Sequence, residues 1–222
     1  MTKTAIAIIG ATGNMGSALA KSLAKGPYRL LLFAHDNAKL ESVKEEITRT
    51  VPTAELECVG CPTDASWQAD VIISAVPYAA EKEVVEKIRT VATQKIVVSI
   101  ANPLNETYDG LVTTPGTSAA EELQKLLPAS KVVKAFNTTY AADFSQPVIN
   151  GQQVDCFVAG NDSEAVSVVK ELVATVGFNP VVAGDLSVSR TLEAMQLLLI
   201  QLTVKNNYNW LAGFKILHNK TN

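Results

Sequence analysis

The sequence has few of the residues on which most catalytic and metal sites depend. Its 222 residues include only two histidines and three cysteines, and charged residues make up 18%. It contains neither the G-x-S-x-G motif of hydrolases nor the H-E-x-x-H motif of zinc peptidases. The net charge of −3 excludes a strongly basic chain, so we expect no nucleic-acid partner. We predict no dedicated catalytic acid–base residue and no bound metal.

Long apolar runs are also absent. No run approaches the roughly 18–20 residues that a bilayer-spanning helix needs, so we expect no membrane partner. The apolar stretch near the N-terminus is too short for a signal peptide. Without an export signal and with few cysteines, a reducing cytoplasm is the expected location. The hydrophobic content of 47% suffices for one large α/β domain, alone or with a small extension.

Two of the cysteines form the motif Cys58-Val-Gly-Cys61. Such a pair is elsewhere a redox dithiol or half of a zinc site. Zinc would need two more ligands, and Cys156 and the two histidines are scattered along the chain. A redox pair is favoured at a helix N-terminus, whereas Pro62 predicts a turn. We therefore interpret both as incidental cysteines that follow a strand.

Strand and helix signals alternate along nearly the whole chain. The predicted strands, most of them continuous runs of Val, Ile and Leu, are 5–9, 29–33, 55–59, 70–75, 95–99, 131–135, 154–159 and 179–183. The predicted helices are 14–25, 37–49, 79–92, 117–127 and 163–176. This alternation predicts the α/β class and a doubly wound parallel sheet whose strands are buried on both faces.

The end of the chain differs from the rest. An irregular segment, 145–153, predicts a boundary between a dinucleotide-binding domain over 1–150 and an extension over 151–222. From Ser187 onward, apolar residues fall on two faces of a long helix, which predicts burial on more than one side. Docking onto its own domain explains this pattern, and a subunit interface or a wall of the substrate pocket explains it equally well. Our prediction includes a homo-oligomer.

Residues 5–16, AIAIIGATGNMG, are the most informative segment. An apolar strand runs into a glycine-rich turn and then a helix, as in a dinucleotide-binding βαβ unit. Gly10 permits the tight turn, Gly13 lets the backbone approach a pyrophosphate, and Gly16 lets the helix pack on the strand. Free N–H groups and the helix dipole then meet the phosphates. An ordinary strand-to-helix turn is the alternative, but the context on both sides favours nucleotide binding.

The tip of the second predicted strand decides between NAD and NADP. An acidic residue there binds the ribose hydroxyls of NAD, whereas basic residues accommodate the extra phosphate of NADP. The segment holds Ala34, His35, Asp36 and Lys39. His35 and Lys39 suit a 2′-phosphate, while Asp36 is either a ribose ligand or the N-cap of the next helix. We predict NADP, with NAD as the alternative.

Three further strand ends carry polar or rigid residues. They are 75–78 (AVPY), 99–103 (SIANP) and 136–140 (FNTTY). Each by itself is ordinary turn chemistry. In open α/β sheets, however, ligands bind beyond the carboxyl ends of the strands. Three such ends at one edge therefore predict a site.

The spacing Tyr78-x-x-x-Lys82 matches the catalytic pair of short-chain dehydrogenases. In those enzymes the pair follows the fifth strand, whereas here it follows the fourth, so we interpret it as coincidental. Hydride transfer between two flat rings needs positioning and exclusion of water more than proton chemistry. The scarcity of acids and bases is compatible with such a reaction.

The chain resembles the deazaflavin-dependent NADP oxidoreductases and the related cytosolic reductase domain of the six-transmembrane metalloreductases. The resemblance spans nearly the full length and rests on GATGNMG (10–16), AVPY (75–78), KIVVSIANP (95–103), VVKAFNT (132–138), FVAGNDSEA (157–165) and AGDLSVSRTLE (183–193). It implies a Rossmann fold with a small C-terminal α/β extension that ends in a long helix and completes the acceptor pocket.

The resemblance also implies roles for matching residues. Pyrophosphate ligands would be Thr12, Gly13, Asn14 and Met15, beside Gly10 and Gly16 of the same loop. The 2′-phosphate positions are Ala34, His35 and Lys39. The nicotinamide side would be lined by Val76, Pro77, Asn102 and Ala141. Asn137 and Thr138 would lie where the two rings meet, with Tyr78 helping to position them. Where the family has a Ser-Arg pair at the 2′-phosphate, this chain has Ala34 and His35. Where the deazaflavin enzymes have a histidine near the coenzyme, this chain has Asn137, as does the metalloreductase branch.

These observations predict an NADP(H)-dependent oxidoreductase that passes a hydride between nicotinamide and a flavin- or deazaflavin-like acceptor. One alternative is an atypical short-chain reductase or epimerase acting on a small carbonyl compound, with Tyr78 as proton donor. Another is a non-catalytic module that senses NADP(H).

Overall fold

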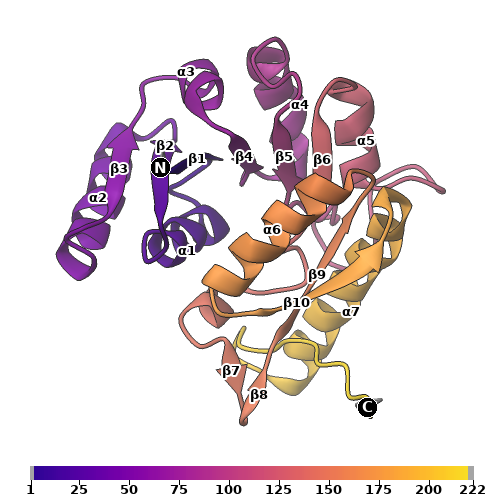
Figure 1. Ribbon diagram of the computed structural model, residues 1–222. Helices are drawn as coiled ribbons and strands as arrows, with labels where there is room; N and C mark the ends of the chain where they lie inside the picture. Colours follow the sequence, from indigo (N-terminus) through magenta and orange to yellow (C-terminus); the bar gives the residue numbers. More distant parts are fainter. Residues whose placement is uncertain (1–2, 220–222) are drawn as a thin grey trace.

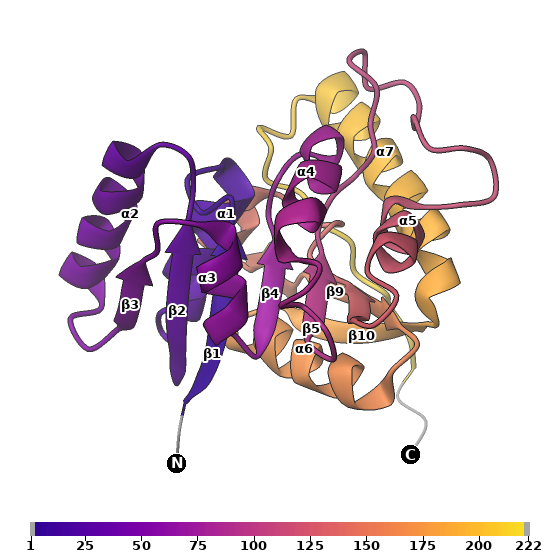
Figure 2. The same cartoon turned by 90° about the horizontal axis from the view of Figure 1, so that it is seen from above.

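Eight strands form one twisted sheet with helices on both faces (Figures 1 and 2). The computed structural model describes residues 3–219. The strands of the sheet are β1 (Thr4–Ile9), β2 (Tyr28–Phe33), β3 (Glu55–Cys58), β4 (Val71–Ser74), β5 (Ile96–Ser99), β6 (Lys131–Lys134), β9 (Asp155–Gly160) and β10 (Asn179–Gly184). The helices are α1 (Asn14–Leu23), α2 (Asn37–Thr50), α3 (Pro62–Gln68), α4 (Tyr78–Ile88), α5 (Ala119–Leu126), α6 (Ser163–Thr175), α7 (Ser189–Asn206) and the short 3-10 helices η1 (Ala141–Phe144) and η2 (Leu186–Val188).

The strand order is β10-β9-β6-β5-β4-β1-β2-β3. The chain runs outward from β1 to β3, then returns to lay β4, β5 and β6 on the other side of β1. The topological switch point, where doubly wound sheets bind ligands, therefore lies between β1 and β4. All eight predicted strands are present, and the α/β class is confirmed.

One pairing departs from the predicted parallel sheet. β9 runs antiparallel to β6, while β10 is parallel to β9. A parallel return needs a crossover, usually an α-helix. The connection from β6 to β9 instead holds η1 and the hairpin of β7 (Val148–Ile149) and β8 (Gln152–Gln153). The hairpin occupies the predicted boundary, and the sheet continues across it. The division at residue 150 stays a prediction.

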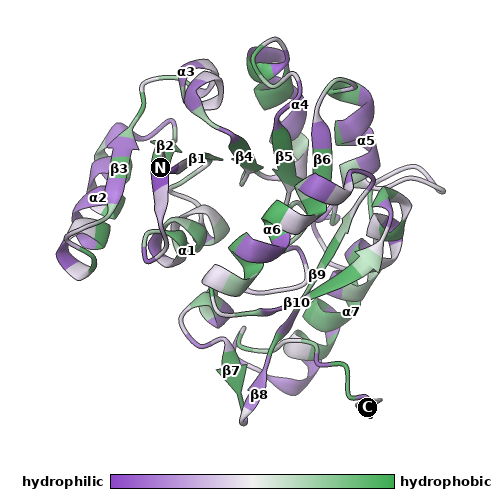
Figure 3. Cartoon of the chain, in the orientation of Figure 1, coloured by the Kyte–Doolittle hydropathy of each residue, from purple (hydrophilic) through white to green (hydrophobic). Residues whose placement is uncertain are grey.

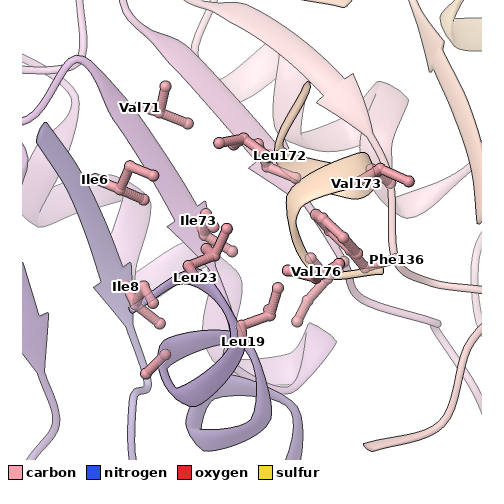
Figure 4. Packing of buried hydrophobic residues seen from close by; sticks show 14 of the residues in the cluster. Ile6, Ile8, Leu19, Leu23, Val71, Ile73, Phe136, Leu172, Val173 and Val176 are labelled. Atoms are coloured by element: carbon pink, nitrogen blue, oxygen red, sulfur yellow. The ribbon is translucent and has the colours of Figure 1, made fainter. Parts of the chain in front are cut away.

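The core lies on both faces of the sheet, because successive strand residues point to opposite sides. Ile6 and Ile8 of β1 pack with Leu19 and Leu23 of α1 on one face (Figure 4). Ile9, in contrast, belongs to the cluster under α3, α4 and α5. Figure 3 shows apolar residues along the central strands and polar residues on the outer surfaces of the helices. Burial on both faces is confirmed for the central strands, whereas the edge strands β3 and β10 are partly exposed.

The segment after β3 is a helix that the sequence reasoning did not predict. Pro62 stands in its first turn, a position that tolerates proline because that N–H has no partner within the helix. The Sγ of Cys61 caps this helix by accepting the N–H of Asp64 at 3.3 Å. The turn predicted from Pro62 was therefore wrong. Cys58 is the last residue of β3, and both cysteines are free.

The long C-terminal helix is buried on one side, not on two. Leu192 and Ile200 of α7 are buried, as predicted. Leu198, Leu202 and Val204 are exposed to 50%, 38% and 60%. Within the described residues the chain itself covers only one side of α7, so docking onto its own domain does not account for the second apolar side, and burial in a subunit interface stays a prediction. Among residues 3–219, no helix is long and apolar enough to cross a membrane.

Candidate functional site

The glycine-rich loop joins β1 to α1 at the switch point, and its glycines differ in what surrounds them. Gly10 has a φ of +96°, and a Cβ there would collide with the carbonyl of Ala75 at the end of β4. A Cβ on Gly16 would collide with the carbonyl of Gly10. Gly13 has a φ of −71°, and the nearest atom to an added Cβ lies 3.4 Å away. The first two glycines are therefore required by the fold itself, whereas Gly13 is not.

The start of α1 offers a set of free N–H groups. Within residues 3–219, the amides of Thr12, Asn14, Met15 and Gly16 have no hydrogen-bond acceptor. The helices α2, α5 and α6 are capped by the side chains of their own N-cap residues, but Gly13 has no side chain with which to cap α1. Unpaired amides at the positive end of a helix favour an anion. The arrangement fits a pyrophosphate.

The end of β2 places two basic side chains at the surface. His35 and Lys39 are exposed, whereas Ala34 is buried. Asp36 is the N-cap of α2, where its side chain accepts the N–H of Lys39 at 3.0 Å. That hydrogen bond lowers the pKa of the Asp36 carboxyl, so it is ionised at neutral pH. One carboxylate oxygen also lies 3.6 Å from the Lys39 Nζ. Of the two roles left open for Asp36, the structure shows the cap.

The ends of β5 and β6 are joined by their asparagines. The Asn102 Nδ2 donates to the backbone carbonyl of Asn137 at 2.8 Å, and the Asn137 Nδ2 donates to the Asn102 Oδ1 at 2.9 Å. The Asn137 Nδ2 also donates to the carbonyl of Leu192 in α7 at 3.1 Å. Two predicted site residues, 35 positions apart in the sequence, thus form one rigid unit.

A cavity of about 330 Å³ lies beside this unit. It is lined by Asn14, Met15, Ile100, Asn102, Tyr108, Phe136, Asn137, Thr139, Tyr140, Ala141, Ala142, Gln196, Ile200 and Trp210. The predicted residues Asn14, Met15, Asn102, Asn137 and Ala141 therefore meet in one place. A larger groove of about 550 Å³ runs along α1 and shares Asn14, Ala141 and Ala142 with the cavity. Free amides, buried amide side chains and apolar walls together suit a nucleotide and a second flat molecule.

Other predicted residues lie outside this cavity. Thr138 is fully buried, and its hydroxyl has no partner within the described chain. Val76 and Pro77 lie at the end of β4, where Val76 packs on the core near Gly10 and Pro77 precedes α4. They flank the switch point from the side opposite β2, because β4 and β2 are the two neighbours of β1.

Tyr78 is held by a carboxylate. Its hydroxyl donates to the Glu122 Oε2 at 2.5 Å. Burial and this carboxylate raise the pKa of Tyr78 to about 12. Lys82, which would lower that pKa in a short-chain dehydrogenase, is exposed and is not among its partners. The phenol is therefore unsuited to proton donation, which agrees with the interpretation of the Tyr-Lys spacing as coincidental.

The structure also reveals a buried ion pair that sequence reasoning missed. The Lys134 Nζ lies 2.6 Å from the Glu193 Oε1, and both side chains are at most 1% exposed. The same ammonium donates to the carbonyl of Ala101, next to Asn102, at 2.5 Å. Glu193 in turn accepts the N–H groups of Ala119 and Ala120 at the start of α5. The pair therefore links β6, the end of β5, α5 and α7 behind the cavity.

A further carboxyl, Glu81 of α4, lies in the same buried region. Its exposure is 4%, and its Oε1 has no partner among the described residues. Burial raises the pKa of Glu81 to about 7, although the nearby Lys134 opposes the shift. For the pair of Lys134 and Glu193, the sequence offers only a lysine within the apolar run VVKAF and a glutamate within TLEAM. Neither segment indicates which residue would be the partner of its charged side chain.

The comparisons with known proteins agree with this geometry. A family model described as "NADP oxidoreductase coenzyme F420-dependent" matches residues 5–103. The chain is 34% identical over 211 residues to the F420-dependent NADP reductase of Methanocaldococcus jannaschii, covering 90% of this chain and 92% of that protein. It is 36% identical over 107 residues to the metalloreductase STEAP3 of Rattus norvegicus, covering 48% of this chain and 21% of that protein. A crystal structure of an Arthrobacter sp. FB24 protein has the same fold, with a TM-score of 0.80 at 24% identity, covering 97% of this chain and 99% of that one.

Proposed function

Because this chain belongs to the coenzyme F420-dependent NADP oxidoreductase family, we propose that it transfers a hydride between NADP(H) and a deazaflavin. The observation that carries the proposal is the match over nine-tenths of the chain to a reductase of that name. The uncapped start of α1 beside an amide-lined cavity supports it. A flavin is the alternative acceptor, since the two ring systems have similar shapes.

The residues of the site divide into those that would bind NADP(H) and those that would bind the acceptor. The free amides of Thr12, Asn14, Met15 and Gly16 would hold the pyrophosphate, whereas the Gly13 amide already donates to the Gly10 carbonyl at 3.1 Å. His35 and Lys39 would face the 2′-phosphate of NADP. The nicotinamide ring, which would supply or accept the hydride, would lie between the end of β4 and the Asn102–Asn137 unit. Asn137 would also contact the acceptor.

No acid–base residue is needed to move the hydride itself. The chain's task is to hold two rings roughly 3–3.5 Å apart and keep water out. When NADPH is oxidised, the acceptor takes up the hydride and one proton, which solvent can provide. The mutual hydrogen bonds of Asn102 and Asn137 support a rigid floor for such an arrangement.

The test is anaerobic oxidation of NADPH, followed by absorbance, with coenzyme F420 and riboflavin phosphate as separate acceptors. We expect turnover with F420, and the ratio of the two rates identifies the preferred ring. NADPH binding without turnover on either acceptor would refute the proposal. Such a result would favour the carbonyl reductase or the sensor.

We also propose a homo-oligomer that buries the outer side of α7. Leu198, Leu202 and Val204 present apolar side chains there at 38–60% exposure. Sedimentation at several concentrations tests this, and a monomer throughout would refute it. A cytoplasmic location is proposed as well, in keeping with the three free cysteines.

A further inference from the structure

Two of the residues that line the cavity carry a buried amide oxygen with no hydrogen-bond partner within residues 3–219. The two oxygens are the Oδ1 of Asn137 and the Oε1 of Gln196, in side chains that are 1% and 3% exposed. Buried polar groups are nearly always paired in folded proteins, because leaving them unpaired costs free energy. Nine buried side-chain oxygens lack a partner in the described chain, and these two share one cavity, where a ligand with matching groups would pair with them.

Gln196 makes fewer hydrogen bonds than Asn137 does. The Asn137 amide nitrogen is already used by Asn102 and Leu192. No hydrogen bond of the described chain involves the Gln196 side chain, so its oxygen and both of its N–H groups remain available. No motif or spacing in the sequence points to a role for this residue.

The position of Gln196 is fixed by the turn of α7 that precedes it. Leu192 accepts the Asn137 amide, and Glu193 pairs with Lys134 while capping α5. Gln196 follows three residues after Glu193, so it lies on nearly the same side of the helix. Its amide is thus presented to the cavity from a firmly anchored helix.

The walls near α7 are flat and apolar. Tyr108, Tyr140 and Trp210 line the cavity together with Ile200, and the Tyr140 and Trp210 rings meet edge to face with centroids 5.5 Å apart. The Gln201 Nε2 donates to the carbonyl of Tyr108 at 3.3 Å, which ties the loop after β5 to α7. Such walls suit an aromatic ring system.

We propose that Gln196 binds the acceptor by hydrogen-bonding a ring edge that carries alternating C=O and N–H groups. A primary amide has an acceptor and donors side by side, so it can pair with both groups of a cyclic imide. Flavins and deazaflavins share this edge. The inference rests on the proposed function and assigns to α7 the half of the site that binds the acceptor. The nucleotide approaches from the walls that Asn14 and Met15 of α1 provide.

The test is Gln196→Met, which keeps the side-chain length and removes both hydrogen-bonding groups. The control is Gln152→Met, because Gln152 is exposed on β8 and outside the cavity. Dissociation constants for coenzyme F420, riboflavin phosphate and NADPH are measured by fluorescence, together with KM and kcat. We expect affinity for both ring acceptors to fall about 10- to 100-fold in Gln196→Met, with a raised KM for the acceptor. NADPH affinity should change less than twofold.

Stability provides a check on folding. Because the Gln196 amide has no partner in the protein, Gln196→Met should melt no lower than the wild type. Gln196→Glu is the second variant; it keeps the shape and removes both N–H donors, so it should also weaken acceptor binding.

Unchanged acceptor affinity in both variants would overturn the inference while leaving the proposed function standing. Loss of NADPH affinity equal to the loss for the acceptors would also overturn it, because Gln196 would then belong to the nicotinamide side. Failure of the wild type to bind either acceptor would instead refute the proposed function.

Discussion

Replacing Glu193 with glutamine removes one charge from the buried pair with Lys134 and keeps nearly the same shape. Lys134 would remain fully buried, with the carbonyl of Ala101 and a neutral amide as its partners. The glutamine would also accept the α5 N–H groups less strongly than the carboxylate does.

Breaking a buried ion pair by removing one partner typically costs about 3–5 kcal/mol, because the other charge is left uncompensated. For a chain of this size, 1 kcal/mol corresponds to roughly 2–4 °C in Tm, so the expected shift is about 6–20 °C. Lys134→Met should cost less, since the Glu193 carboxylate keeps the N–H groups of Ala119 and Ala120. The double variant should lose less than the sum of the two, by about 0.5–3 kcal/mol.

Urea unfolding at pH 7 measures these differences as changes in midpoint with an unchanged slope. The matched control is Glu83→Gln, which breaks the exposed Glu83–Lys87 pair with the same N–O distance of 2.6 Å. Exposed pairs contribute about 0–1 kcal/mol, so this variant should be nearly neutral. If Glu193→Gln lost no more stability than Glu83→Gln, or if the two single effects simply added, the buried pair of Lys134 and Glu193 would not stabilise the fold.

Four further predictions follow from the site. Gly13→Ala should leave Tm unchanged, because its Cβ meets nothing closer than 3.4 Å. It should nevertheless weaken NADPH binding at least about tenfold by obstructing the phosphates. Calorimetry measures both the Tm and the NADPH affinity of the variant, and an unchanged affinity would contradict the prediction. Lys39→Met should raise the Kd for NADPH several-fold and leave that for NADH unchanged, and equal changes would argue against a 2′-phosphate contact. Tyr78→Phe should lower kcat less than about tenfold, since its phenol is held by a carboxylate and has a pKa of about 12; a loss of several hundredfold would restore the proton-donor alternative. Burial raises the pKa of Glu81 from 4.5 to about 7, so between these pH values the folded state keeps a proton that the unfolded state has released. The free energy of unfolding should therefore fall by about 3 kcal/mol as pH rises through that window. Glu81→Gln should remove this decline, and an unchanged pH profile of unfolding in the variant would contradict the prediction.

The local parts of the fold were predictable from the sequence. Runs such as AIAII, RLLLF and VVK contain the apolar residues that a strand buried on both faces requires. The glycine spacing from Gly10 to Gly16 predicted the strand, turn and helix in the right order. Because parallel strands end at one edge, the meeting of Asn102 and Asn137 also followed from strand order.

The direction of a strand within the sheet and the side of a helix that the domain covers were not predictable from the sequence. The helix after Cys61 has only seven residues and starts with a proline, so it carries no periodic signal. Whether β9 runs parallel or antiparallel to β6 depends on how the connection between them folds. Similarly, the apolar residues of α7 do not reveal which of them the domain covers.

The class of the fold, the glycine loop and the family can be inferred from the sequence alone, because these depend on short segments whose spacing sets their conformation. The buried pair of Lys134 and Glu193, 59 residues apart, is visible only in the folded chain. The same holds for the unpaired amide of Gln196 at the cavity. A buried polar side chain acquires its role from the groups that pack around it, and those come from distant parts of the chain.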